Sequence, residues 1–373
     1  MAQKLLEQLI PYQELPAGQH STAIRRRILI VAPAGCMSSL AGAQIPALAA
    51  RLVREGHIVD IHTLSPILRA SIVGGRFAGY GRLLPDKLFL MRSLYHAISR
   101  HDVIHLMAVP PVAILESLLP ALMLAKFFGK QTVVSFAGGS VEDITGKLSR
   151  FLLPALRLVD HVTVPTEWSA RLLARHHLRV KVAPTAIDPT EIAPRLVQDI
   201  QPRILSFIMA GPDSNITTIL RAYLLAKQKY PRVELTLVGS ADRLKIAAPL
   251  AQRVGGIRLV DASQKETIRD CWGSCDLVVN NSTDDDLPLS VLQALAYGIP
   301  TISCDAGGLT AVIQDSVNGL IFPSNNPSAL ADRIIDLIEQ PALVTQLSRS
   351  GPAEALRFTW PNVRCRWIAL FNR

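Results

Sequence analysis

Short apolar stretches alternate with amphipathic stretches along almost the whole chain, and this alternation runs twice. The first run begins at residues 28–32 and the second at 204–208, with prolines at 184, 189, 194 and 202 between them. Strands that are apolar throughout are typical of a parallel sheet covered on both faces, because each crossover between parallel strands needs a helix. The sequence therefore predicts an α/β chain of two doubly wound, Rossmann-like domains.

The same patterns give the expected elements of each domain. In the first, we expect helices at 45–55 and 115–128 and strands at 28–32, 58–63, 103–106, 131–136, 161–164 and 180–182. In the second, we expect helices at 217–229, 289–297 and 327–340 and strands at 204–208, 235–238, 258–260, 277–280 and 301–303. Asn325 or Asn326 would cap the helix at 327–340. The proline-rich break at 185–202 predicts domains of 1–190 and 200–355, with a C-terminal helix at 359–373 returning to the first domain.

Length and composition agree with two packed domains. The chain has 373 residues, of which 49% are hydrophobic and 18% charged. A chain of this length is comfortable for two domains, and its low charge argues against disorder. The stretch 106–128 is apolar, but Pro110, Pro111, Glu116 and Pro120 interrupt it, so we expect no spanning helix.

The cysteines and the N-terminus bear on localisation. Five cysteines are spread along the chain, and Cys271 and Cys275 are four residues apart with no histidine nearby. This pattern argues against a zinc site and favours buried free thiols in a reducing cytoplasm. Residues 1–10 include Lys4 and Glu7 and do not resemble a signal peptide. We therefore expect a cytoplasmic protein.

The charge of the chain suggests which surfaces it could approach. The formal net charge is +9, and basic residues are in excess over the first hundred positions. Nucleic acid is one possible partner, but no basic face interleaved with aromatic residues accompanies the charge. An anionic membrane surface or a phosphorylated lipid fits better, and residues 5–10 form an amphipathic start that suits membrane attachment. The chain is therefore expected to be cytoplasmic or peripheral at the inner face of the membrane.

The stretch from 284 to 330 carries the clearest indication of function. A polar loop precedes an apolar helix at 289–297, which Gly298 and Pro300 end, and a β-branched strand and a Gly307-Gly308 turn follow. Such a unit directs the free amides of a helix N-terminus at one point, which suits a phosphate group.

Several segments taken in order resemble the family-4 glycosyltransferases of the GT-B fold. The resemblance runs from residue 27 to the C-terminus and is carried by the segments 27–63, 101–105, 133–143, 183–188, 284–330 and 358–360. It implies two Rossmann-like domains facing each other across a cleft, an acceptor-side domain first and a nucleotide-sugar domain second. It also implies a retaining transfer from a nucleotide-diphosphate sugar, with no metal and no other cofactor.

The resemblance places the candidate site residues at three points of the chain. In the second domain the loop and helix would supply Ser282, Asp285, Leu287, Leu289 and Gln293, of which Asp285 would contact the sugar and is the candidate catalytic residue. The end of the expected strand at 235–238 would supply Gly239 and Arg243. In the first domain, Gly138 and Gly139 would either let the backbone approach the ligand or form a tight turn.

Most charged side chains that the family uses at this site are replaced here. Ala137 stands at the family's histidine, Met209 and Ser214 at its arginine and lysine, Gln293 at an acidic residue and Ala311 at a glutamate. A charge-assisted hydrogen bond contributes roughly 1.5–3 kcal/mol, so two lost cations would weaken diphosphate binding by about 10²- to 10⁴-fold. Arg243 and Lys245 could replace them, or could simply be a solvated helix start.

Two other patterns could be misread as catalytic. Residues 284–286 are Asp-Asp-Asp, which would form a metal–diphosphate clamp in a different glycosyltransferase fold but here favours a polar loop. His57, His62, His105 and His161 lie near expected strand ends, where packed or solvated histidines are more common than catalytic ones.

Two functional hypotheses follow. The chain is either a hexosyltransferase that acts on a glycan or lipid-linked acceptor in envelope or exopolysaccharide synthesis, or a catalytically silent relative that binds a partner glycosyltransferase or a glycan. The sequence leaves open the sugar, the nucleotide base, the acceptor and the oligomeric state.

Overall fold

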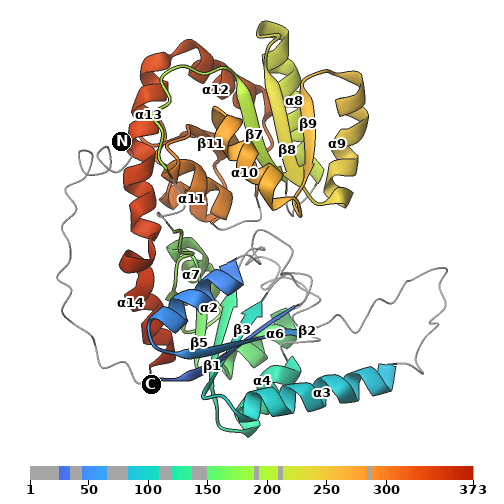
Figure 1. Ribbon diagram of the computed structural model, residues 1–373, viewed down its shortest axis with the longest axis vertical. Helices are drawn as coiled ribbons and strands as arrows, with labels where there is room; N and C mark the ends of the chain where they lie inside the picture. The colour runs from blue at the N-terminus through green and yellow to red at the C-terminus, as the bar shows by residue number, and fades with distance from the viewer. Residues whose placement is uncertain are drawn as a thin grey trace. The chain divides into compact units, whose positions relative to one another are not determined.

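The computed structural model describes residues 25–33, 44–64, 83–108, 119–136, 149–188, 193–208, 213–283 and 287–372 (Figure 1). These residues form two compact units. The described residues up to 183, together with those from 364, form the N-terminal unit, and residues 184–363 form the C-terminal unit. Each unit contains one six-stranded sheet in which every strand pair is parallel.

The sheet of the N-terminal unit has the strand order β2-β1-β3-β4-β5-β6. Its strands are β1 (Arg27–Pro33), β2 (Ile58–Leu64), β3 (Val103–Ala108), β4 (Gln131–Phe136), β5 (His161–Val164) and β6 (Val180–Val182). Its helices are α2 (Gln44–Arg54), α3 (Leu83–Ser99), α4 (Leu119–Phe127), α6 (Ser149–Arg157) and α7 (Glu167–Ala174). Every residue of β3 and β4 is buried, as expected for central strands covered on both faces.

The sheet of the C-terminal unit has the order β12-β11-β10-β7-β8-β9. Its strands are β7 (Arg203–Ile208), β8 (Glu234–Gly239), β9 (Ile257–Asp261), β10 (Leu277–Asn280), β11 (Thr301–Cys304) and β12 (Leu320–Phe322). Its helices are α8 (Asp213–Lys229), α9 (Ala241–Arg253), α10 (Lys265–Ser274), α11 (Leu289–Ala296), α12 (Pro327–Glu339) and α13 (Pro341–Ala355), with 3₁₀ helices η4 (Gly307–Ala311) and η5 (Leu356–Phe358). The predicted fold class, α/β with two parallel Rossmann-like sheets, is confirmed.

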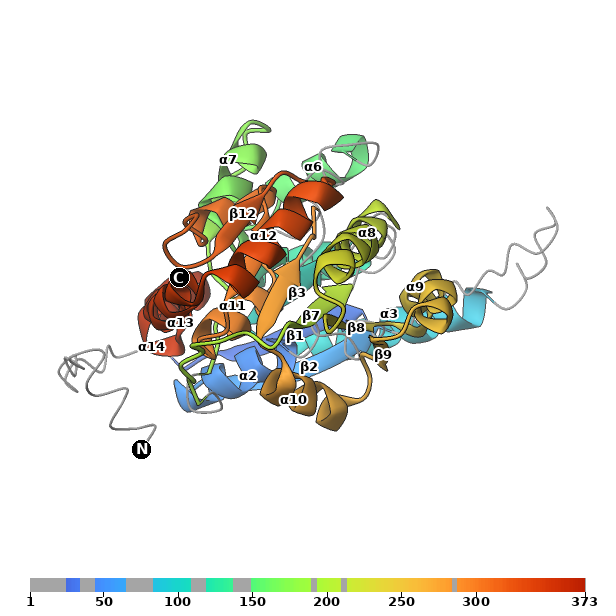
Figure 2. The same ribbon diagram turned by 90° about the horizontal axis from the view of Figure 1, so that it is seen from above.

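Two hydrophobic layers enclose the sheet of the C-terminal unit. Ile204 and Ile208 of β7 pack in the layer that contains side chains of α8 and α12, while Leu205 packs in the layer that contains Trp272 of α10. Figure 2 shows α8 and α12 on one side of this sheet and α10 on the other. Successive residues of a strand point to opposite faces, which is why a strand buried on both faces is apolar throughout.

The last helix, α14 (Trp360–Phe371), contains residues of both units. Within the N-terminal unit, the Gln131 side chain donates a hydrogen bond of 2.8 Å to the carbonyl oxygen of Leu370. The rings of Trp367 and Phe371 lie 6.0 and 5.6 Å from that of His105. The end of α14 therefore packs over β3 and β4 by both apolar and polar contacts.

Several details differ from the sequence-based expectations. No helix was expected at α3 or α13, and α8 begins at Asp213 rather than at residue 217. In the first half of α3, Pro85, Asp86 and Lys87 interrupt the apolar residues, so no clear 3.6-residue period marks one face. Asn326, not Asn325, caps α12, because its side chain accepts a hydrogen bond from the amide of Ala329. Cys365 is exposed on α14, which corrects the expectation that the thiols are buried, although Cys271, Cys275 and Cys304 are buried and free.

Candidate functional site

The topology of the C-terminal unit indicates where a ligand would bind. From β7 the chain builds β8 and β9 on one side, and then returns to build β10, β11 and β12 on the other. In doubly wound sheets, ligands bind at the carboxyl ends of the strands where the order reverses, since the loops there diverge to opposite faces. In this unit that point lies between β7 and β10. The loop after β10 is the one in which the sequence placed Ser282, Leu287 and Leu289.

Buried side-chain amides connect the loop after β10 to the start of α8. The Asn281 Nδ2 atom donates a hydrogen bond of 3.1 Å to the carbonyl oxygen of Asn215, and the Thr283 hydroxyl lies 3.5 Å from Asn215 Oδ1. The neighbouring Asn280 Nδ2 donates to Ser303 Oγ of β11 over 3.3 Å. All three asparagines are buried, so these bonds fix the loop relative to the strands on either side.

Two polar atoms at this edge are buried and unsatisfied. Asn215 Nδ2 and Asn281 Oδ1 have no hydrogen-bond partner among the residues that the structure describes. A buried polar atom without a partner costs about 1–3 kcal/mol, so such an atom calls for a specific explanation. One atom donates and the other accepts, so a ligand with hydroxyl or carbonyl groups could satisfy both. The sequence reasoning missed these residues, although the hydrogen-bonding run at 280–283 directly after an apolar strand is a visible signal.

Helix α11 begins beside this loop, and its N-cap residue supplies no capping side chain. Its N-cap residue is Pro288, which makes no side-chain hydrogen bond to the helix. The carbonyl oxygen of Pro288 accepts from the amides of Val291 and Leu292 at 3.1 and 3.3 Å, while the amides of Leu289 and Ser290 lie in the first turn, where a helix offers no internal acceptor. Leu287 is buried, and Gln293 is half-buried one turn into the helix. Asp285 lies outside the described residues.

Gly239, at the end of β8, is explained by packing. It pairs in register with Ile208 of β7, and a Cβ at this position would lie 2.8 Å from both Ile208 Cγ1 and the Ile208 carbonyl oxygen. A side chain here would clash with a main-chain atom that cannot move cheaply. The structure therefore accounts for this glycine without a ligand.

The two candidate replacement cations differ in their surroundings. Both lie on α9, which begins two residues after Gly239. The Lys245 ammonium makes an exposed ion pair of 2.7 Å with Asp242, and this hydrogen bond raises the pKa of Lys245 and lowers that of Asp242. Arg243 is half-buried in the first turn. An exposed pair contributes little to stability, but Asp242 offsets the charge of the Lys245 ammonium that an anion would otherwise meet.

Other predicted site positions are only partly described. Ala137, Gly138, Gly139 and Met209 lie outside the described residues. Ser214 is the second residue of α8, and Ala311 is the exposed last residue of η4. The carbonyl oxygen of Ser282 accepts a hydrogen bond of 3.3 Å from the Cys304 thiol of β11.

A buried histidine in the N-terminal unit makes hydrogen bonds like those of a catalytic base, but its pKa and its burial do not suit that role. His105 Nε2 lies 2.6 Å from Ser135 Oγ, which lies 2.7 Å from Thr163 Oγ1, and all three side chains are buried. A serine next to a histidine is the arrangement of a nucleophile and its base. Burial lowers the pKa of His105 to about 3, and no part of the ring reaches solvent. The contacts are therefore structural, in line with the expected role of these histidines.

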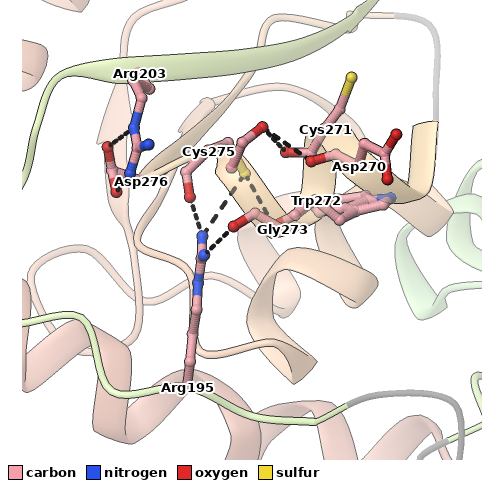
Figure 3. Close-up of polar contacts among 9 residues, drawn as sticks. Arg195, Arg203, Asp270, Cys271, Trp272, Gly273, Cys275 and Asp276 are labelled. Atoms are coloured by element: carbon pink, nitrogen blue, oxygen red, sulfur yellow. Dashed lines mark hydrogen bonds and ion pairs between the residues drawn. The ribbon is translucent and has the colours of Figure 1, made fainter. Parts of the chain in front are cut away.

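Arg195 makes a contact that the sequence did not predict. Its guanidinium donates to the carbonyl oxygens of Gly273, at 2.8 Å, and Cys275, at the end of α10 (Figure 3). Nearby, Arg203 makes a two-pronged ion pair with Asp276 at 2.7 and 2.9 Å. A cation at the carbonyl end of a helix offsets the negative end of its dipole. Burial raises the pKa of the Cys275 thiol to about 12, so this cysteine is not a nucleophile near neutral pH.

The described ranges offer neither a cluster of metal ligands nor a membrane-spanning segment. Within those ranges, no group of three or more His, Cys, Asp or Glu side chains is placed to share a metal ion. No described helix has both the length and the apolar character needed to cross a bilayer.

The C-terminal part of the chain is similar in sequence to known proteins. Residues 190–354 match the family model of the glycosyl transferases group 1. A D-inositol 3-phosphate glycosyltransferase from Segniliparus rotundus is 27% identical over 185 residues, covering 48% of this chain and 39% of the relative. An exopolysaccharide phosphotransferase from Streptomyces coelicolor is 26% identical over 227 residues, covering 57% of this chain and 23% of the relative. The chain thus matches less than half of the length of these curated relatives.

Solved structures with the same fold cover the chain more fully. Sucrose-phosphate synthase from Thermosynechococcus elongatus superposes with a TM-score of 0.70 and 17% identity, covering 93% of this chain and 98% of the other. HepE from Anabaena, solved in complex with UDP and glucose, gives a TM-score of 0.68 and 17% identity, covering 93% and 99%. The two parallel sheets and these neighbours define a GT-B fold. Within it, residues 190–354 match the glycosyl transferases group 1 model, which agrees with the resemblance seen in the sequence.

Proposed function

We propose that this protein is a glycosyltransferase that moves a hexosyl group from a nucleotide-diphosphate sugar to a hydroxyl group of a glycan or lipid-linked acceptor. The observation that carries the proposal is the β7–β10 edge, where the uncapped start of α11 and two unsatisfied buried amide atoms lie in the group 1 domain. HepE, which shares the fold, was solved with UDP and glucose bound, and another relative is an exopolysaccharide phosphotransferase. We therefore assign the acceptor to envelope or exopolysaccharide synthesis.

The reaction requires stabilisation of a leaving anion. The bond between the sugar C1 and the diphosphate oxygen breaks, the acceptor oxygen forms a new bond to C1, and the acceptor hydroxyl releases its proton. Negative charge grows on the diphosphate as it leaves, so positive potential at that point lowers the barrier. The first turn of α11 supplies about half a positive charge together with the amides of Leu289 and Ser290.

Side chains around that point have distinct proposed roles. Asp285 would accept hydrogen bonds from the sugar hydroxyls, and Gln293 would bond to the ribose without a charge. Arg243, half-buried in the first turn of α9 after the end of β8, is the proposed side-chain cation for the diphosphate. Gly138 and Gly139 would let the first-domain backbone approach the ligand.

A second candidate function has its own supporting observation. Ala137, Met209, Ser214, Gln293 and Ala311 are all uncharged where the resembled family carries charged or titratable side chains. A site that lacks these groups would hold a nucleotide sugar weakly and stabilise the leaving group poorly. Under this alternative the chain is a silent member that binds a partner glycosyltransferase or a glycan.

One experiment separates the two candidates. The purified chain is titrated with UDP, UDP-glucose and other nucleotide sugars by calorimetry, and nucleoside-diphosphate release is measured with each. Binding of one donor, weakened by Gln293→Ala but not by Gln252→Ala, an exposed glutamine of α9, supports a nucleotide site at α11. Release of diphosphate supports the transferase. Binding without release, or no binding of any donor, would contradict the transferase and leave the silent relative.

A further inference from the structure

Two neighbouring helices of the N-terminal unit expose large apolar side chains. Met91 and Tyr95 lie one turn apart on α3 and are 38% and 48% exposed. Met123 and Phe127 lie one turn apart on α4 and are 60% and 81% exposed. Figure 1 shows α3 and α4 in the N-terminal unit, each ending near the other. Single exposed apolar residues are ordinary, but four in this arrangement need an explanation.

Ring contacts join the two helix faces into one surface. The ring of Tyr95 lies 5.1 Å from that of Phe128, and Phe128 lies 5.3 Å from Phe127. We call the surface formed by Met91, Tyr95, Met123, Phe127 and Phe128 the α3–α4 patch. Lys130 strengthens the junction, since its ammonium donates a hydrogen bond of 3.1 Å to the carbonyl oxygen of Ser99 at the end of α3.

Basic residues outnumber acidic ones in the sequence around the α3–α4 patch. Residues 83–102 and 119–130 contain five lysines and arginines and two aspartates, Asp86 and Asp102. Arg92 directly follows Met91 in α3, Arg100 directly follows the helix, and both are exposed. Lys126 is paired with Asp160 at 2.9 Å, so Arg92 and Arg100 are the more available of the cations whose side chains are described. A partner of this patch must therefore be apolar at its centre and negatively charged around it.

We infer that the α3–α4 patch docks the protein on an anionic membrane surface. A bilayer interface accepts aromatic and methionine side chains at the level of the acyl boundary, and anionic headgroups attract the basic residues beside them. Such a surface needs no matching shape, which suits side chains that project separately from two helices. Because no described helix can cross a bilayer, the attachment is peripheral. The inference does not rest on the proposed function, since docking is measured without turnover.

Vesicle flotation of the full chain tests the inference. The probes are vesicles of phosphatidylcholine alone and vesicles of phosphatidylcholine mixed equally with phosphatidylglycerol. We expect binding to the anionic vesicles to be at least about tenfold stronger, and to fall as the salt concentration rises. Met123→Ser with Phe127→Ser should reduce binding to the anionic vesicles by about fivefold or more, because the inserted apolar area is lost. Arg92→Gln with Arg100→Gln should reduce it by about tenfold and weaken its dependence on salt.

Matched controls lie on the C-terminal unit. Leu225→Ser with Val317→Ser removes two exposed apolar side chains, and Arg232→Gln with Arg253→Gln removes two exposed charges, all outside the patch. Both controls should bind as the wild type does. Equal binding to neutral and anionic vesicles, or equal loss in patch and control variants, would overturn the inference. So would a concentration-dependent dimer that the Met123 and Phe127 variant abolishes, because the patch would then be covered by a second copy of the chain.

Discussion

The side-chain nitrogen of Asn281, Nδ2, donates a hydrogen bond of 3.1 Å to the backbone carbonyl oxygen of Asn215, 66 residues earlier in the chain. This bond connects the end of β10 to the first turn of α8, across the point where the strand order reverses. It leaves Asn281 Oδ1 buried and without a partner among the described residues, directly after the carboxyl end of β10, where parallel sheets bind ligands.

We predict that Asn281 contributes to nucleotide-sugar binding. Asn281→Ala removes the unsatisfied acceptor and loosens α8, so the dissociation constant should rise by about two- to tenfold, as expected for one hydrogen bond. Asn280→Ala is the matched control, because Asn280 bonds to Ser303 inside the sheet. Both variants should lower the melting temperature, but only the first should change calorimetric affinity. Equal affinity losses would mean that the effect comes through folding.

Restoring the missing cations should strengthen diphosphate binding. Met209→Arg with Ser214→Lys adds two positive charges where the resembled family carries them, and affinity or hydrolysis should rise by at least about tenfold, roughly 1.4 kcal/mol. Gln198→Arg with Gln252→Lys adds the same charge at exposed positions elsewhere in the unit and should have no such effect. A wild-type rate of about 1 s⁻¹ or more would show that another residue already supplies the charge.

The two cations of α9 should not be equivalent. Arg243→Gln should weaken binding of a nucleoside diphosphate by about tenfold, since a charge-assisted bond contributes roughly 1.5–3 kcal/mol. Lys245→Gln should change it little, because Asp242 already holds that ammonium. Affinities measured at low and high salt check this, since loss of a real phosphate contact also reduces the salt dependence. The reverse order of effects would assign the role to Lys245.

Acid should destabilise the N-terminal unit partly through His105. Burial lowers its pKa from 6.5 to about 3, so below about pH 6.5 the unfolded chain takes up a proton that the folded protein does not. Stability therefore falls as pH drops from about 6.5 towards 3, by up to about 1.4 kcal/mol per pH unit for this group.

The measurement is urea unfolding of wild type and His105→Gln at about pH 7 and pH 5.5. The wild type should lose about 1 kcal/mol more than the variant over this interval, after the offset at neutral pH is subtracted. The exposed His96→Gln should lose as much as the wild type. Parallel losses in all three proteins would show that His105 is protonated in the folded state.

Apolar strands were the most predictable part of the fold. Residues 131–136 and 161–164 form β4 and β5 within the expected bounds, because buried parallel strands carry their signal in a few consecutive residues. Helices were less visible. α3 and α13 were not expected, since α3 is apolar on several sides at its start and α13 has Pro352 inside it.

The sequence predicted only those parts of the candidate site that consist of consecutive residues. The α11 helix and its Gly298 end are visible in consecutive residues, and Gly298 adopts a positive φ of 68° as such an end requires. The Asn215–Asn281 hydrogen bond joins residues 66 positions apart. The hydrogen bonds from Arg195 to the carbonyl oxygens at the end of α10 join residues about 80 positions apart. Such contacts depend on tertiary packing, which no local pattern encodes.

The strand order of the C-terminal unit has a consequence for its local stability. β7 and β10 each pair with a strand on both sides, whereas β9 and β12 lie at the two edges of the sheet. Sheets open from their edges, so amide hydrogens of β7 and β10 should exchange with solvent last. The loops that carry the proposed ligand contacts thus start from the slowest-exchanging strands of the unit, and a partial opening at β9 or β12 would leave their anchor points in place.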